Sequence, residues 1–208
     1  MTDPRREVLK AAQSLHRDGM NVGTAGNLSL REGEGMLITP SGRNYLEMES
    51  QDIVFVGADG QVEGTVKPSS EWRFHLEIYQ NFEDAGAIVH THSTHATALA
   101  CLNLDIPAFH YEVAFAGGSD IRCASYATFG TSELAHNIVT ALKERSACLI
   151  GHHGLVCYGS GLRAALALAQ KIEQLSQIYL QCLSVGEPEI LDDKEMAKVV
   201  EKFRNYSG

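Results

Sequence analysis

Apolar residues recur at helical spacing in several separate stretches of the chain. Near the start, Thr2 or Asp3 can cap a helix with Pro4 in its first turn, and this helix should end near Gly19. A second helix should open at residues 69–71. Its apolar stripe consists of Trp72, His75, Leu76 and Tyr79. Further helices are expected over residues 94–102, 134–142, 162–183 and 193–203.

Short apolar runs bounded by Gly, Pro, Asn and Asp are typical of β-strands and their turns. Such runs cover residues 28–30, 36–38, 53–56, 62–66, 87–90, 147–150 and 155–158. Asp59-Gly60 lies between two of these runs and is a hairpin signal, so the sheet should be at least partly antiparallel. Strands and helices alternate irregularly, and together they predict α/β layers around a central sheet.

Length and composition are those of an ordinary globular protein. The chain has 208 residues, of which 44% are apolar and 21% charged, and this balance excludes disorder, collagen and coiled coil. Because no repeat or linker-like run divides the sequence, a single domain over residues 1–208 is predicted. The net charge of −9, without a basic stripe, argues against nucleic-acid binding.

The cysteines and the first residues favour a reducing compartment. Five cysteines are present, an odd number, and no pair has C-x-x-C spacing. The N-terminus lacks the apolar region of a signal peptide, and no run approaches the ~18 apolar residues that a membrane span needs. We therefore predict a cytoplasmic protein without a membrane partner.

A histidine pair, His90-Thr91-His92, ends the apolar run at residues 87–90. In a strand, side chains at i and i+2 point to the same face, so the two imidazoles would lie a few ångströms apart. Such a pair forms half of a metal site. A polar strand end that faces solvent explains the same pattern.

A second histidine pair, His152-His153, precedes Gly154 between two predicted strands. At most one of two adjacent side chains can point toward the first pair. A third imidazole converging on His90 and His92 would give the three-histidine arrangement of catalytic zinc sites. A loop pair satisfied by backbone carbonyls is the alternative, and spacing does not decide between them.

Glu71 and three small polar turns complete the candidate chemistry. Glu71 follows Pro68-Ser69-Ser70 at a helix start, where a glutamate is also favoured by the helix dipole. Backbone amides and hydroxyls in the turns at 23–29, 39–42 and 67–70 can hold a phosphate. The same residue types are common in ordinary turns. Because the protein is acidic, a phosphate site would need local positive charge, from oriented amides, Lys67 or a divalent metal.

The five segments G-T-A-G-N-L-S, T-P-S-G, P-S-S-E, H-T-H-S and H-H-G-L occur in this order. Together they resemble the class II aldolase family of L-fuculose-1-phosphate aldolase and L-ribulose-5-phosphate 4-epimerase. The resemblance covers residues 5–206. It implies a three-layer α/β/α fold with a central, mainly antiparallel sheet, and a homotetramer with its sites between subunits.

The resemblance also implies roles for particular residues. Three histidines, His90, His92 and His153, would bind Zn²⁺, with Mn²⁺ or Co²⁺ as possible replacements. Glu71 would be the catalytic acid/base, and Tyr111 a catalytic acid that acts across a subunit boundary. His152 would lie next to the metal ligands without binding the metal itself. The implied phosphate-binding residues are Gly26, Asn27, Ser41, Gly42, Ser69 and Ser70, and the implied substrate-pocket residues are Phe129 and Tyr206, the latter on a closing tail.

The activity implied is the reversible cleavage of a ketose 1-phosphate into dihydroxyacetone phosphate and a short aldehyde. Lactaldehyde, acetaldehyde and methylthioacetaldehyde are the candidate aldehydes. Alternatives on the same scaffold are a pentose-phosphate 4-epimerase, against which His110-Tyr111 counts, and a methylthioribulose-phosphate dehydratase. A non-catalytic, adducin-like binding domain is the alternative from another class. Such a domain would be expected to lose the histidines or Glu71, and all of them are present.

Overall fold

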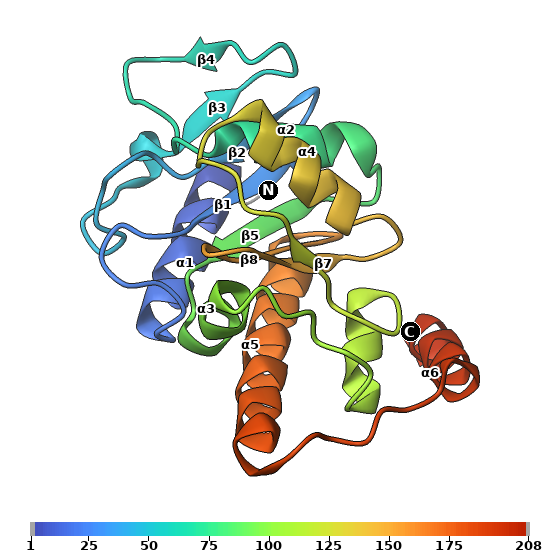
Figure 1. Cartoon of the computed structure of the whole chain (residues 1–208). Coiled ribbons are helices and arrows are strands. Elements are labelled where there is room, and N and C mark those ends of the chain that lie inside the picture. The colour runs from blue at the N-terminus through green and yellow to red at the C-terminus, as the bar shows by residue number, and fades with distance from the viewer. Residues whose placement is uncertain (1–2, 207–208) are drawn as a thin grey trace.

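The computed structural model describes residues 3–206, and their strands form one eight-stranded sheet (Figure 1). The strand order is β4-β3-β2-β1-β5-β8-β7-β6, and every neighbouring pair is antiparallel except β6 and β7. The strands are β1 (Asn27–Glu32), β2 (Gly35–Ile38), β3 (Val54–Val56), β4 (Val62–Glu63), β5 (Ala87–Thr91), β6 (Cys123–Ala124), β7 (Ala147–Ile150) and β8 (Gly154–Gly159).

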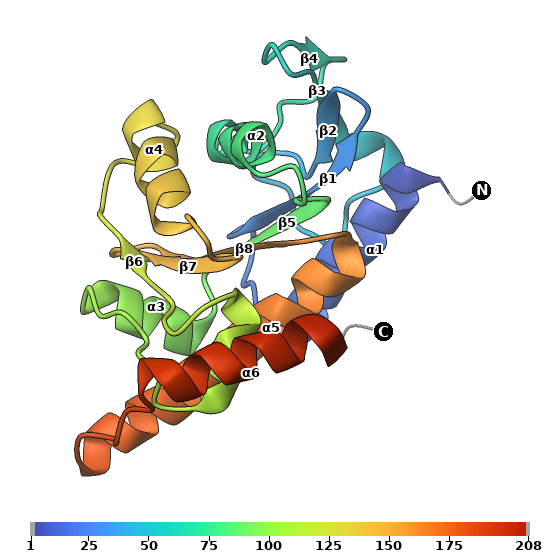
Figure 2. The same ribbon diagram turned by 90° about the vertical axis from the view of Figure 1, so that its right-hand side faces the viewer.

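Helices cover both faces of this sheet (Figure 2). One face carries α2 (Trp72–Asn81) and α4 (Ser132–Ala141). The other face carries α1 (Pro4–Arg17), α3 (Thr94–Cys101) and α5 (Leu162–Val185). The predicted three-layer α/β/α fold with a mainly antiparallel sheet is therefore confirmed.

Alternation along the strands explains why both faces need a helical layer. In β7, Ala147 and Leu149 join the core of α1, α3 and α5, whereas Cys148 and Ile150 join the core of α2 and α4. All four side chains are fully buried. Each large apolar side chain buried in this way stabilises the fold by about 1.5–3 kcal/mol, so neither face of the sheet is left to solvent.

Two short elements and a helix complete the chain. They are the 3-10 helices η1 (Ser50–Asp52) and η2 (Tyr111–Ala116), and α6 (Asp193–Tyr206). Phe203 of α6 packs on η2, with its ring centroid 4.2 Å from that of Phe115 and 6.1 Å from that of Tyr111. No helix within residues 3–206 is long and apolar enough to cross a bilayer.

Most predicted elements are present, but two details of the prediction were wrong. The buried face of α2 consists of Phe74, His75, Ile78 and Tyr79, so Trp72 and Leu76 are only partly buried. Phe74 and Ile78 fill the core against the sheet. The buried stripe of α2 is therefore rotated by about one residue from the predicted stripe. The strand predicted over 62–66 is only two residues long.

Glu173 of α5 caps the first turn of α3, directly after the segment that carries His92. Its carboxylate accepts hydrogen bonds from the backbone N–H groups of His95 and Ala96, each at 2.9 Å, and lies 2.7 Å from His95 Nδ1. Burial alone would raise the pKa of Glu173, but these contacts and one from Ser93 hold it below its usual value. The helical layer thereby fixes the turn between β5 and α3.

Glu173→Gln should lower the free energy of unfolding at pH 7 by about 1–3 kcal/mol, because a charge-assisted contact to the helix N-terminus is lost. Since the folded-state pKa lies below the unfolded value of about 4.3, the stabilisation is present above that pH and disappears as the pH falls through the folded value. Urea unfolding of both proteins should therefore converge as the pH falls below the folded-state pKa of Glu173.

Glu201→Gln, at an exposed position of α6, is the matched control and should leave stability unchanged at both pH values. A stability difference for Glu173→Gln that does not depend on pH would contradict this account of the cap.

Candidate active site and metal centre

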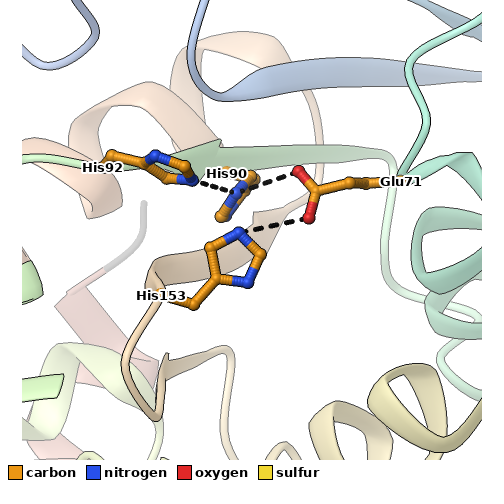
Figure 3. Close-up of side chains that lie close together, drawn as sticks. All are labelled: Glu71, His90, His92 and His153. Atoms are coloured by element: carbon orange, nitrogen blue, oxygen red, sulfur yellow. Dashed lines mark hydrogen bonds and ion pairs between the residues drawn. The ribbon is translucent and has the colours of Figure 1, made fainter. Parts of the chain in front are cut away.

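Four side chains from three parts of the chain converge at one end of the sheet (Figure 3). Glu71 immediately precedes α2, His90 lies in β5, His92 follows β5, and His153 lies in the turn between β7 and β8. One ligand atom from each residue lies within 4.8 Å of the others. Both histidine segments of the sequence thus contribute to a single cluster.

Contacts inside the cluster join the carboxylate to the imidazoles. Glu71 Oε2 lies 3.2 Å from His90 Nε2, and Glu71 Oε1 lies 3.2 Å from His153 Nε2. His90 Nε2 is also 3.1 Å from His92 Nε2. The three imidazole rings surround a common centre, and the ring centroids of each pair are 4.8–4.9 Å apart.

His90 is oriented by the neighbouring strand. Its Nδ1 lies 2.9 Å from the carbonyl oxygen of Leu155, which can only accept a hydrogen bond. Nδ1 therefore carries the proton in the neutral ring, and Nε2 keeps its lone pair toward the cluster. A backbone carbonyl behind a ligating imidazole is the arrangement that orients metal-binding histidines.

His92 is held in its neutral form. Burial, followed by the neighbouring His90 and His153, lowers its pKa to about 4, although Glu71 acts in the opposite direction. The ring therefore stays uncharged near pH 7, as a metal ligand requires.

Glu71 carries the charge of the cluster. Burial alone would raise its pKa, but His90 and His153 hold the pKa well below its usual range. The side chain of Asn27 donates a 2.9 Å hydrogen bond to Oε2. Apart from its contact with His153, Oε1 is buried without a hydrogen-bonding partner among the described residues. Three imidazole nitrogens and a carboxylate with an unsatisfied oxygen fit a divalent cation.

Backbone geometry selects His153 rather than His152 for this cluster. His152 has a φ of +54°, which turns its side chain away, and its Nε2 lies 3.0 Å from Asn103 Nδ2. Gly154 allows the close approach of this turn, because a Cβ there would lie 2.3 Å from the carbonyl oxygen of Thr91 and 3.1 Å from the ring of His92. The glycine of H-H-G is thus a packing requirement.

A cavity of about 380 Å³ opens beside Glu71, and all the predicted phosphate-binding residues line it. Its wall is formed by Thr24, Ala25, Gly26, Asn27, Pro40, Ser41, Gly42, Ser69, Ser70, Glu71, His92, Tyr126, Phe129, His152 and His153. The Gly26 turn requires glycine, since its φ is +72° and a Cβ would lie 2.3 Å from the Asn21 side chain. Thr24 lies within the turn predicted at 23–29, although it was not named as a binding residue, and the sequence-based prediction missed Tyr126.

Residues 6–180 match the family described as the class II aldolase and adducin N-terminal domain. The chain belongs to this family. A protein of Rhodospirillum rubrum named 5-methylthioribulose-1-phosphate/5-deoxyribulose-1-phosphate aldolase is 50% identical over 97% of this chain and 91% of its own length. The L-fuculose phosphate aldolase of Escherichia coli K12 is 48% identical over 97% and 94%, respectively.

Among solved structures, one named L-fuculose 1-phosphate aldolase superposes with a TM-score of 0.94 at 41% identity, covering 98% of this chain and 97% of its own. The predicted family, its fold and the assignment as a class II aldolase are confirmed by these comparisons. A divalent-metal site is supported by the family together with the cluster of Glu71 and the three histidines.

One predicted residue of this class II aldolase, Tyr111, is not part of the cavity wall in the described chain. Tyr111 lies in η2, in the layer of α1, α3 and α5, where its ring stacks on Phe203 and is 49% exposed. Its predicted role concerned a neighbouring subunit and stays a prediction. Tyr206 is the last residue of α6, and its side chain lies outside the described residues. Lys67 is exposed and is not part of the cavity wall.

His153→Ala and His152→Ala form a matched pair of adjacent substitutions. His153→Ala should weaken zinc binding at least about 10–100-fold, because it removes a ligand, whereas His152→Ala should retain the metal. Zinc content after dialysis against a weak chelator measures both. Equal zinc loss in the two variants would show that the ligand set is wrong.

Proposed function

We propose that this class II aldolase is zinc-dependent and reversibly cleaves a ketose 1-phosphate into dihydroxyacetone phosphate and a short aldehyde. The supporting observation is the position of the Glu71–histidine cluster at one side of a cavity whose other walls are hydroxyl- and amide-rich turns. This combination suits a substrate with both a phosphate and adjacent oxygens next to the bond that breaks.

His90, His92 and His153 would hold the cation, with Glu71 as a further ligand before substrate arrives. A divalent cation bound there supplies Lewis-acid stabilisation of the negative charge that develops on substrate oxygens during carbon–carbon cleavage. Neutral imidazoles suit this purpose because they leave the positive charge of the cation undiminished.

Glu71 acts as the proton shuttle at the carbon that becomes part of dihydroxyacetone phosphate. It is ionised, buried and at the edge of the cavity, so it can accept a proton from a bound substrate. Tyr111 of a neighbouring subunit protonates the aldehyde oxygen in the condensation direction. Its exposure on η2 agrees with a role outside its own chain.

The phosphate is held by the turns that face Glu71. Ser41 and Gly42 come from one turn, and Ser69 and Ser70 precede α2, where their hydroxyls and the positive end of the helix dipole favour an anion. Asn27 adds an amide donor at the start of β1. Hydroxyl and N–H donors bind a phosphate without the basic residues that this acidic chain lacks at the cavity wall.

Phe129, which is 64% exposed at the cavity wall, contacts the aldehyde part of the substrate, and Tyr206 closes over it. The chain forms a single domain over residues 1–208 and functions in the cytoplasm. It assembles as a homotetramer, which brings Tyr111 to the neighbouring cavity. The half-exposed Tyr111 and Phe115 on η2 favour such an assembly.

A cleavage assay on the zinc-loaded protein tests the activity and ranks the aldehydes. We expect dihydroxyacetone phosphate from at least one of L-fuculose 1-phosphate, 5-deoxyribulose 1-phosphate and 5-methylthioribulose 1-phosphate, and none after chelation. L-Ribulose 5-phosphate is the control, because its cleavage cannot yield that product. Absence of product from every 1-phosphate, with zinc bound, would refute the aldolase proposal.

Glu71→Gln should reduce kcat by about 10²–10⁴-fold, since the amide cannot shuttle a proton, while zinc stays bound through the three imidazoles. Steady-state kinetics and zinc content are measured together. The control is Glu83→Gln, an exposed glutamate just beyond the other end of α2, which should behave like the parent protein. Parent-like turnover in Glu71→Gln would rule out this role.

A further inference from the structure

A series of buried, hydrogen-bonded polar groups leads away from Glu71. Asn27 Nδ2 donates to Glu71 Oε2 at 2.9 Å, and Asn27 Oδ1 lies 2.5 Å from His75 Nε2. His75 Nδ1 lies 2.7 Å from Ser29 Oγ, which lies 2.8 Å from the hydroxyl of Tyr79. This series therefore runs from the Glu71 carboxylate into the interface between β1 and α2.

These groups are withdrawn from solvent. His75 and Ser29 are fully buried, Asn27 is 3% exposed and Tyr79 is 5% exposed. His75 neither lines the cavity nor belongs to the Glu71–histidine cluster. Burying a polar group is costly unless it is hydrogen-bonded, and both ring nitrogens of His75 have a partner.

The orientation of the Asn27 amide, with its nitrogen on Glu71 and its oxygen on His75, sets the direction of every bond in this series. A carboxylate only accepts, so the Asn27 atom that faces it is the amide nitrogen, and the amide oxygen faces His75. Because that oxygen also only accepts, the proton of the neutral His75 ring lies on Nε2. Nδ1 then accepts from the Ser29 hydroxyl, which in turn accepts from Tyr79.

The surroundings of His75 and Tyr79, the two titratable members of this series after Glu71, keep both side chains neutral. Burial, and after it the neighbouring His90, lowers the pKa of His75 to about 3, against the opposite influence of Glu71. Burial raises the pKa of Tyr79 above its usual value. His75 is thus a neutral ring with one donor and one acceptor, and Tyr79 keeps its proton.

We propose that His75 is a positioning residue that locks the Asn27 amide in the one orientation that donates to Glu71. If the amide turned over, its oxygen would face the carboxylate, and two acceptors would meet in a buried space. The second N–H of the same amide nitrogen is available to the substrate phosphate, since Asn27 also lines the cavity. One locked amide thus orients Glu71 and contributes to phosphate binding.

The functional part of this inference rests on the proposed role of Glu71 as the proton shuttle. The part that concerns bond direction and metal binding does not, because it depends on the hydrogen bonds alone. The experiments below separate the two parts.

The matched variants His75→Gln and His75→Asn remove opposite ends of the ring. Glutamine can place its amide nitrogen near the position of Nε2 and keep the donor to Asn27. Asparagine can place its amide near Nδ1, keeping the contact with Ser29 and losing the donor to Asn27. We expect kcat within about threefold of the parent for His75→Gln, and about 10–100-fold lower for His75→Asn, with a smaller change in KM.

Ile78→Val is the control for general destabilisation. It trims a fully buried apolar side chain three residues further along α2, and that side chain makes none of the hydrogen bonds between Glu71 and Tyr79. It should lower the melting temperature without lowering kcat. If kcat in all three variants fell in step with melting temperature, His75 would have only a structural role and the proposal would fail.

Two readouts do not depend on the substrate. Zinc affinity of the substrate-free protein, measured by competition with a chromophoric chelator, should fall about tenfold in His75→Asn and stay near the parent value in His75→Gln. The ¹⁵N shifts of labelled histidine should show that the proton of His75 lies on Nε2. Equal zinc affinities, or a proton on Nδ1, would overturn the proposal even if the aldolase activity were established. Both predicted results with no cleavage of any sugar phosphate would support the bond direction and refute only the proposed function.

Discussion

Glu71 keeps a negative charge although its side chain is almost completely withdrawn from water. A lone carboxylate in such a place would be strongly destabilising, so its partners have to be held in position. His90 and His153 contact its two oxygens, and Asn27 donates to one of them. Each partner is itself fixed by a backbone feature or a further hydrogen bond, so the charge of one residue explains much of the polar structure around it.

The sheet supplies the register that brings these partners together. Asn27 in β1 lies opposite His90 in β5, and Thr91 lies opposite Leu155 in β8. Because side chains alternate along a strand, a slip of one residue in either pairing would turn His90 away from Asn27 or from its Leu155 carbonyl. The apolar cores on both faces resist such a slip, since it would expose buried side chains of β5 and β8. Core packing and site geometry therefore depend on the same register.

Sequence patterns predicted most of the sheet and helices because apolar periodicity reflects burial directly. They predicted His90 and His92 on one strand, but the choice between His152 and His153 depends on a left-handed φ at His152 that spacing does not encode. Taken on its residues alone, Glu71 looked like a helix-start residue favoured by the dipole. In the structure it occupies the N-cap position, but its side chain makes no capping bond, because it turns to the imidazoles.

Other features could not be predicted because they are too short or irregular to show a period, or because they depend on contacts between distant segments. β6 has two residues and η2 follows no simple period, so neither has a pattern to detect. His75 was predicted as a member of an apolar stripe, and it is buried as predicted. Its bonds to Asn27 and Ser29 join segments almost fifty residues apart, and only tertiary structure brings those segments together.

The central claim is that three imidazoles from two separate segments hold one catalytic cation beside Glu71. Zinc K-edge X-ray absorption on substrate-free protein, loaded with one equivalent of zinc, tests it most directly. The account predicts three imidazole nitrogens and light oxygen ligands at about 2.0–2.1 Å. Sulfur ligands at about 2.3 Å, or fewer than three imidazoles, would contradict it.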